Sequence, residues 1–153
     1  MSIWGPGIAD NDDAADWLDE FMDEPSIMAL HDAFDEVLSG ENSDYVEVTE
    51  GAAAVAAAQI VTELFSKGGA KRLIEDEDVL LGGKGSVKQL HPGSRLHLVE
   101  RAMRALSTVV YGAATSELHE LVHEDAKLAK TWMKSMQGLE VRLLQVKEKL
   151  SSS

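Results

Sequence analysis

The sequence predicts an all-α fold, a compact multi-helix bundle of five to seven helices around a buried alanine-rich helix at Gly51–Phe65. Apolar residues recur at three- and four-residue spacing over most of the chain, which is typical of amphipathic helices. Gly51–Phe65 is apolar on nearly every side, so we expect neighbours on several sides of it. The short alternating stretch Tyr45–Val48 has no evident partner strand and favours an extended lead-in over a sheet.

Two acidic helices are expected within residues 12–40. The first runs from Asp12 to Asp23, with Asn11 or Asp12 as its N-cap and further carboxylates in its first turn. Pro25 either ends this helix or opens the second one. The apolar stripes of the two helices are Ala14, Trp17, Leu18, Phe21 and Met22, then Ile27, Leu30, Phe34, Val37 and Leu38.

The central helix is expected over residues 50–66, with Thr49 as its N-cap. Residues 67–94 then form a connector rich in glycine, a strong helix breaker. Within it, Gly83–Ser86 superficially resembles a phosphate-binding loop, but Lys84 is followed by glycine and no strand precedes it. The connector therefore predicts no nucleotide site.

The C-terminal helices are expected over residues 95–150, with apolar spacing that continues almost to the end of the chain. The last stretch is either one bent helix or two helices. The expected boundaries are Ser94 as an N-cap, an end at Gly112, Thr115 or Ser116 as the next N-cap, and a break near Asp125 or Gly138.

Charge is divided unevenly along the chain. Residues 1–66 hold 16 Asp and Glu and no Lys or Arg, whereas residues 67–153 hold 14 basic and 11 acidic residues, so −16 and +3 sum to −13. Such a field repels nucleic acid and anionic membranes and attracts a basic partner. Either the carboxylates only solvate the outer helix faces, in part paired with later arginines, or they bind protein. The predicted protein-binding residues are Asp16, Asp19, Glu20, Asp23, Asp32, Asp35 and Glu36.

Composition also limits which kinds of protein this chain can be. At 153 residues and 44% apolar, the chain is expected to form one domain with a real core. It has no cysteine, hence no disulfide framework and no Cys-ligated metal. We expect no signal peptide at Met1–Trp4, no membrane span because no run of about 18 apolar residues occurs, and a location in a bacterial cytoplasm.

The opening of the chain resembles a known bacterial family. The residues Trp4-Gly5-x-Gly7, then Asn11-Asp12-x-Ala14-x-Asp16-Trp17, look like the start of domain of unknown function 4259. The alanine-rich helix and Ser116–Leu118 also lie where that family has similar residues, although Ile8–Asp10 stands where members usually have Phe or Tyr. The resemblance implies a helical fold and no established activity, and it supplies no catalytic residue.

One segment matches a catalytic motif. His119-Glu120-x-x-His123 has the H-E-x-x-H spacing, in which two imidazoles on one helical face hold zinc and the Glu acts as general base. The third ligand of such a site is not evident, and the favoured interpretation is an ordinary amphipathic turn with exposed histidines. The oxygen-rich cluster Asp10–Asp13 is interpreted as helix capping, and His31 as a packed surface residue.

Three functional hypotheses follow. The first is a non-enzymatic protein-binding domain with an acidic face, in its most concrete form an immunity-type inhibitor of a basic toxin. The second is a zinc-dependent hydrolase using His119, Glu120 and His123. The third is a structural or homo-oligomer-forming helical protein that uses the long C-terminal apolar seam. No catalytic or cofactor-binding residue is assigned under the first hypothesis, and no nucleic acid or membrane partner is expected.

Overall fold

The computed structural model describes residues 11–39, 44–65, 73, 90–112 and 114–152. Helices pack against one another, and no strand occurs among these residues apart from an isolated bridge between Val46 and Ser116, so the predicted all-α bundle is confirmed. The helices of the described residues are α1 (Asp12–Asp23), α2 (Ile27–Leu38), α3 (Val48–Phe65), α4 (Pro92–Val110), α5 (Glu117–Val122) and α6 (Ala126–Ser151).

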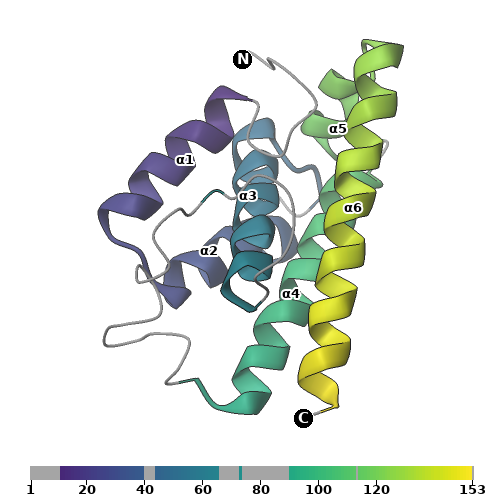
Figure 1. Ribbon diagram of the computed structural model, residues 1–153. Helices are drawn as coiled ribbons and strands as arrows, with labels where there is room; N and C mark the ends of the chain where they lie inside the picture. The colour runs from purple at the N-terminus through teal and green to yellow at the C-terminus, as the bar shows by residue number, and fades with distance from the viewer. Residues whose placement is uncertain (1–10, 40–43, 66–72, 74–89, 113, 153) are drawn as a thin grey trace.

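Helix α3 is the centre of the bundle, as the sequence predicts. It contacts every other helix, and Figure 1 shows it between α1 and α2 on one side and α4 and α6 on the other. Small side chains let these neighbours approach closely. Its fully buried residues include Ala52, Ala54, Ala56, Ala57, Ala58, Ile60 and Val61.

Helix α3 is also long and apolar enough to cross a membrane by composition, with a mean hydropathy of 1.2 over Val48–Phe65. However, 78% of that window is buried inside the bundle. A core helix passes the same test, so the composition of α3 is accounted for by packing against the other helices.

Side-chain caps begin the first two helices. Asn11, rather than Asp12, is the N-cap of α1, and its side chain accepts a hydrogen bond of 2.7 Å from the backbone nitrogen of Ala14. Ser26 does the same for α2 with the nitrogen of Ala29 at 3.0 Å. Pro25 therefore lies between the two helices, and the expected end of α2 at residue 40 falls just outside the described residues.

Thr49 is not the N-cap of the central helix, and that prediction was wrong. Helix α3 begins at Val48, whose nitrogen donates to the Glu117 carboxylate at 2.9 Å. The Thr49 hydroxyl instead donates to Asp13 of α1 at 2.9 Å. The reason lies in long-range pairing: Val46 exchanges backbone hydrogen bonds with the segment before α5, which brings a carboxylate to the start of α3.

Ser94 is likewise inside a helix rather than at its cap. The ring of His91 accepts from the nitrogen of Gly93 at 3.3 Å, and Pro92 occupies the first turn of α4, where its missing N–H costs nothing. The C-terminal helices therefore begin at residue 92 instead of 95. Most of the predicted connector, including Gly83–Ser86, lies outside the described residues.

The C-terminal region contains two helices after α4. Ser116, rather than Thr115, caps α5. Asp125 caps α6, and its side chain accepts hydrogen bonds from the backbone nitrogens of Lys127 at 3.0 Å and Leu128 at 3.1 Å. Gly138 lies within α6, which continues to Ser151. Of the two predicted break points, the one at Asp125 is present, because α5 ends at Val122 and Asp125 caps the start of α6.

A series of side-chain hydrogen bonds joins α3 to α6 and gives a first testable prediction. Arg142 donates to the side-chain oxygen of Gln59 at 2.8 Å, and the Gln59 amide donates to Glu63 at 2.8 Å. Gln59 and Glu63 are both buried, and burial lowers the pKa of Arg142, although Glu63 acts in the opposite direction. Arg142→Ala leaves the Gln59 oxygen without its donor, so we expect a loss of about 2 kcal/mol in the free energy of unfolding.

Urea denaturation followed by circular dichroism measures this loss. The matched control is Arg104→Ala on α4, because Arg104 is exposed and its removal should change stability by less than about 0.5 kcal/mol. Equal stability of the two variants would show that the Arg142–Gln59 hydrogen bond contributes nothing.

Candidate functional site

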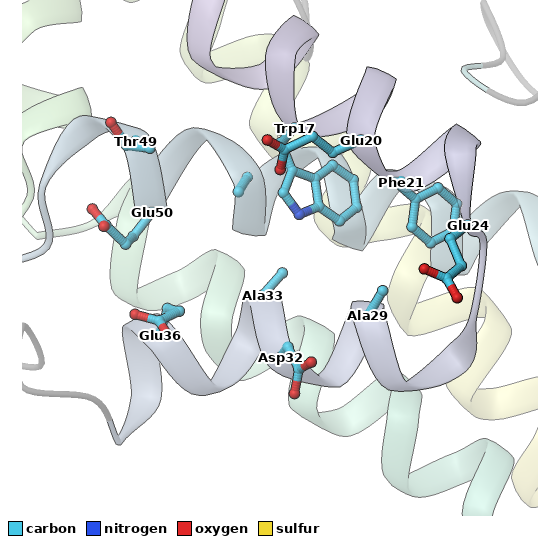
Figure 2. Close-up of a pocket in the computed structure, with 11 residues that line it drawn as sticks. Trp17, Glu20, Phe21, Glu24, Ala29, Asp32, Ala33, Glu36, Thr49 and Glu50 are labelled. Carbon is cyan, nitrogen blue, oxygen red and sulfur yellow. The ribbon is translucent and has the colours of Figure 1, made fainter.

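A groove of about 420 Å³ lies between α1 and α2 and reaches the start of α3. Figure 2 shows Trp17 and Phe21 directed from α1 toward Ala29 and Ala33 of α2. The Trp17 and Phe21 rings stack at 5.2 Å between centroids, with an interplanar angle of 20°. The i, i+4 spacing that predicts an apolar stripe on α1 therefore also builds an aromatic wall, and the alanines of α2 leave space in front of it.

Five carboxylates surround this apolar wall. In Figure 2, Glu24 lies at one end of the groove, and Glu36 and Glu50 lie together at the other. The α1 and α2 sides each add one more, Glu20 and Asp32. No Lys or Arg among the described residues lines the groove, so their carboxylates present negative charge to an occupant at both ends and along both sides.

Glu50 is distinctive among these carboxylates. One of its oxygens, Oε2, is buried and accepts no hydrogen bond from the part of the chain that the structure describes. A buried carboxylate oxygen without a donor is costly, and such groups in native proteins call for an explanation. Because Oε2 is closed off from solvent, an occupant of the groove would reach it only after a change of the Glu50 rotamer.

All seven predicted binding carboxylates are exposed, but only three of them line the groove. Glu20, Asp32 and Glu36 do so, whereas Asp16, Asp19, Asp23 and Asp35 lie outside it. Asp35 is neutralised by an ion pair with Arg101 of α4. Within the described residues the other six form no ion pair, so the carboxylates are not consumed by the later arginines.

Several groove residues were missed from the sequence. Glu24 follows α1 and Glu50 lies in the first turn of α3, and only the packing of α3 against α1 and α2 makes both of them line one groove. The aromatic wall was interpreted as core because its spacing is that of a core stripe. The carboxylate that directly precedes each ring, Asp16 before Trp17 and Glu20 before Phe21, was the one available signal.

Arg101 also binds His31, which gives a pH prediction. A guanidinium has only donors, so at 2.7 Å the Nδ1 atom of His31 must accept, which requires the neutral ring. The pKa of His31 is lowered below 6.5, chiefly by burial and further by the charges of Arg101 and His97. Asp35 and Asp32 raise this pKa, but their effect is smaller. As the pH falls below about 6.5, His31 becomes protonated in the unfolded chain before it does so in the folded protein. Protonation therefore favours the unfolded chain, and the stability that the neutral His31 contributes above this pH is lost as the pH falls.

We therefore expect His31→Gln, which keeps an acceptor but cannot titrate, to flatten the dependence of stability on pH between 7 and 5. Thermal unfolding of both proteins at several pH values measures the difference. Parallel pH profiles would contradict the assigned role of the neutral ring.

The H-E-x-x-H segment forms a packed histidine pair. The rings of His119 and His123 stack at 3.9 Å, and both meet the edge of Trp132 on α6. Their Nδ1 atoms donate to the carbonyls of Val110 at 2.6 Å and of His119 at 2.7 Å, which leaves both Nε2 atoms without a proton in the neutral rings. The pair could thus offer two nitrogen ligands.

The remaining parts of a zinc hydrolase are not assembled around this pair. Glu120 accepts a hydrogen bond from the Tyr45 hydroxyl at 3.1 Å, so it binds the segment before α3. No group of three His, Asp or Glu that could hold a metal ion occurs within residues 11–39, 44–65, 73, 90–112 and 114–152. The histidines contact Trp132 and two carbonyls, which is what a packing role requires.

A second hollow, of about 510 Å³, lies between α4 and α6 and bears on the oligomer hypothesis. Its exposed apolar side chains are those of Tyr111, Val141 and Leu144. Its carboxylate, Glu140, already accepts the Tyr111 hydroxyl proton. This surface has one lining carboxylate, whereas five line the groove between α1 and α2.

Comparisons with known proteins bear on family membership alone. A family model described as "Domain of unknown function (DUF4259)" matches residues 2–135, which is most of the chain and includes the groove. No curated protein matches the chain. No solved structure matches it either. The match extends well beyond the opening residues that carry the resemblance in the sequence, and the chain belongs to the DUF4259 family.

Proposed function

We propose that this chain is a non-enzymatic domain that binds a basic protein through the acidic face formed by α1 and α2. The observation that carries the proposal is a set of six exposed carboxylates on these two helices that form no ion pair with any described residue, in a segment that contains no Lys or Arg. Opposite charge on a partner would accelerate association and exclude anionic competitors such as nucleic acid.

A basic toxin is the most concrete partner, which would make the protein an immunity-type inhibitor acting in the cytoplasm. The choice of partner rests on the charge, because the first 66 residues hold 16 Asp and Glu and no Lys or Arg. A toxin gene beside this one, with growth arrest relieved by co-expression of this chain, would support this form of the proposal.

Affinity purification from the host tests the proposal. The bait is the tag-free protein coupled to a resin, and the matched bait carries Asp16→Asn, Asp19→Asn, Glu20→Gln, Asp23→Asn, Asp32→Asn and Glu36→Gln. We expect a basic protein on the first bait only, released as salt rises from 50 to 300 mM because the screening length of exposed charges falls from about 14 Å to about 6 Å over this range. Binding that ignores salt, or equal binding to both baits, would contradict the proposal.

Zinc-dependent hydrolysis remains the alternative, because both Nε2 atoms of the histidine pair lack a proton when the rings are neutral. Metal analysis of protein purified without a histidine tag decides it. One equivalent of zinc that is lost in His119→Ala would favour the hydrolase, and a metal-free protein would end that hypothesis.

Self-association through the hollow between α4 and α6 is the third hypothesis. It is supported by the exposed apolar side chains of Tyr111, Val141 and Leu144. Light scattering over a range of protein concentrations tests it, and a monomer at every concentration would contradict it.

A further inference from the structure

We propose that the groove between α1 and α2 is an arginine-anchoring site: it receives an arginine-bearing peptide segment of the partner, with one guanidinium on the Trp17 ring. This inference rests on the proposed function, because it specifies what the acidic face binds. It goes beyond that function, because a general negative field requires neither a groove nor a preference among cationic side chains.

The chemistry of the groove walls excludes most other occupants. An apolar side chain would match Trp17 and Phe21 but would remove water from five carboxylates without replacing their hydrogen bonds, which is costly. A lysine ammonium is compact and strongly hydrated, so it makes poor use of an aromatic wall. An arginine stacks its planar head on an indole and packs its aliphatic stem on small residues such as Ala29 and Ala33.

The unpaired oxygen of Glu50 supports the same occupant. Oε2 of Glu50 is buried and lacks a donor within the described residues, and Glu36 lies beside Glu50 at the same end of the groove. A guanidinium carries five N–H donors in a fixed fork, so it can serve more than one carboxylate at once. A single ammonium has three donors and no preferred plane.

Trp17 indicates that the occupant is a peptide rather than a free guanidinium compound. Figure 2 shows the indole nitrogen directed toward the α2 side of the groove, and no hydrogen bond from it is formed within the described residues. Arginine side chains have no acceptor. A backbone carbonyl of the bound segment would accept this indole N–H while the side chains of the segment meet the carboxylates.

The arginines that the structure describes in this chain do not fill the groove. Arg95, Arg101 and Arg104 are on α4 and Arg142 is on α6, and none of them lines the space between α1 and α2. Arg101 and Arg142 are bound to Asp35 and Gln59 respectively. Among the described residues no guanidinium competes for the groove, and we assign the anchoring arginine to a partner molecule.

Isothermal titration calorimetry with two synthetic peptides tests the inference. The probes are acetylated hexa-arginine amide and acetylated hexa-lysine amide, which carry the same charge and differ in the head group. We expect the arginine peptide to bind the wild-type protein at least five-fold more tightly at the same ionic strength. A negative field acting alone would bind both peptides equally.

Two matched triple variants locate the site. Glu20→Gln, Glu24→Gln and Glu50→Gln neutralise three groove carboxylates, and Asp16→Asn, Asp19→Asn and Asp23→Asn neutralise three exposed ones on α1 outside the groove. We expect the groove variant to weaken the arginine peptide at least ten-fold and the other variant at most three-fold. Circular dichroism confirms that both remain folded.

Two substitutions at Trp17 complete the test. Trp17→Leu removes the stacking face and should abolish the preference for arginine, whereas Trp17→Phe keeps a ring and should retain most of it. If Trp17→Leu fails to fold, Trp17→Phe and the triple variants still decide the question.

The outcomes separate the inference from the proposed function. Equal binding of the two peptides, with equal losses in the two triple variants, would overturn the arginine site and leave the acidic face standing. Failure of both peptides to bind the wild-type protein would overturn both. A preference for arginine that survives in the groove variant would place the site elsewhere and overturn the inference.

Discussion

Trp132→Ala is expected to lower the free energy of unfolding by about 4 kcal/mol, because removal of a buried indole leaves a cavity as well as losing transfer free energy. Trp132 is only 3% exposed, and its ring meets the edges of His119 and His123 across the contact between α5 and α6. The variant therefore loosens both the core and the short helix that carries the histidine pair. Urea denaturation followed by circular dichroism measures the change.

Val141→Ala is the matched control for this substitution. Val141 lies on the same helix but is 54% exposed, so we expect a change of less than about 0.5 kcal/mol. A loss below about 1 kcal/mol for Trp132→Ala would mean that α5 does not pack on α6 through this ring.

Ala57→Leu is expected to cost about 3 kcal/mol, because a larger side chain in a well-packed core forces its neighbours off their preferred rotamers. Ala57 is fully buried on α3, the helix that every other helix contacts. No side of α3 is free to take up the added volume. The free energy of unfolding is again the quantity to measure.

Ala126→Leu provides the comparison, since Ala126 is exposed at the start of α6 and leucine has nearly the same helix propensity as alanine. We expect a change of less than about 0.5 kcal/mol there. Equal effects at the two positions would show that α3 is not enclosed by its neighbours.

The helices were predictable wherever side-chain spacing and a local cap agree. Asn11 and Asp125 are the cap positions that sequence patterns favour, and α1 and α6 begin beside them. Thr49 and Ser94 were chosen by the same rule and are wrong. In the first case Glu117, 69 residues away along the chain, reaches the backbone of Val48, and in the second Pro92 begins the helix earlier. The capping rule considers one residue at a time, so it misses both the distant carboxylate at Val48 and the proline that begins α4 two residues before Ser94.

The candidate site was predictable in its charge but not in its shape. A lack of Lys and Arg in the first 66 residues predicts an acidic surface, and three of the predicted binding residues, Glu20, Asp32 and Glu36, line the groove. The groove was not evident, because its walls come from three helices and its aromatic residues have the spacing of a core stripe. Glu50 in particular is a first-turn carboxylate by sequence, and only its burial beside α1 and α2 makes it distinctive.

The most direct test of the acidic groove as a binding site is a chemical-shift map of the ¹⁵N-labelled protein titrated with acetylated hexa-arginine amide. We expect the largest shifts at the Trp17 indole N–H and at backbone amides of α1, α2 and the first turn of α3. The amides of α5 and α6 should change little, because their residues do not line the groove. Shifts that are spread evenly over the acidic residues, or centred on α4 and α6, would contradict the account.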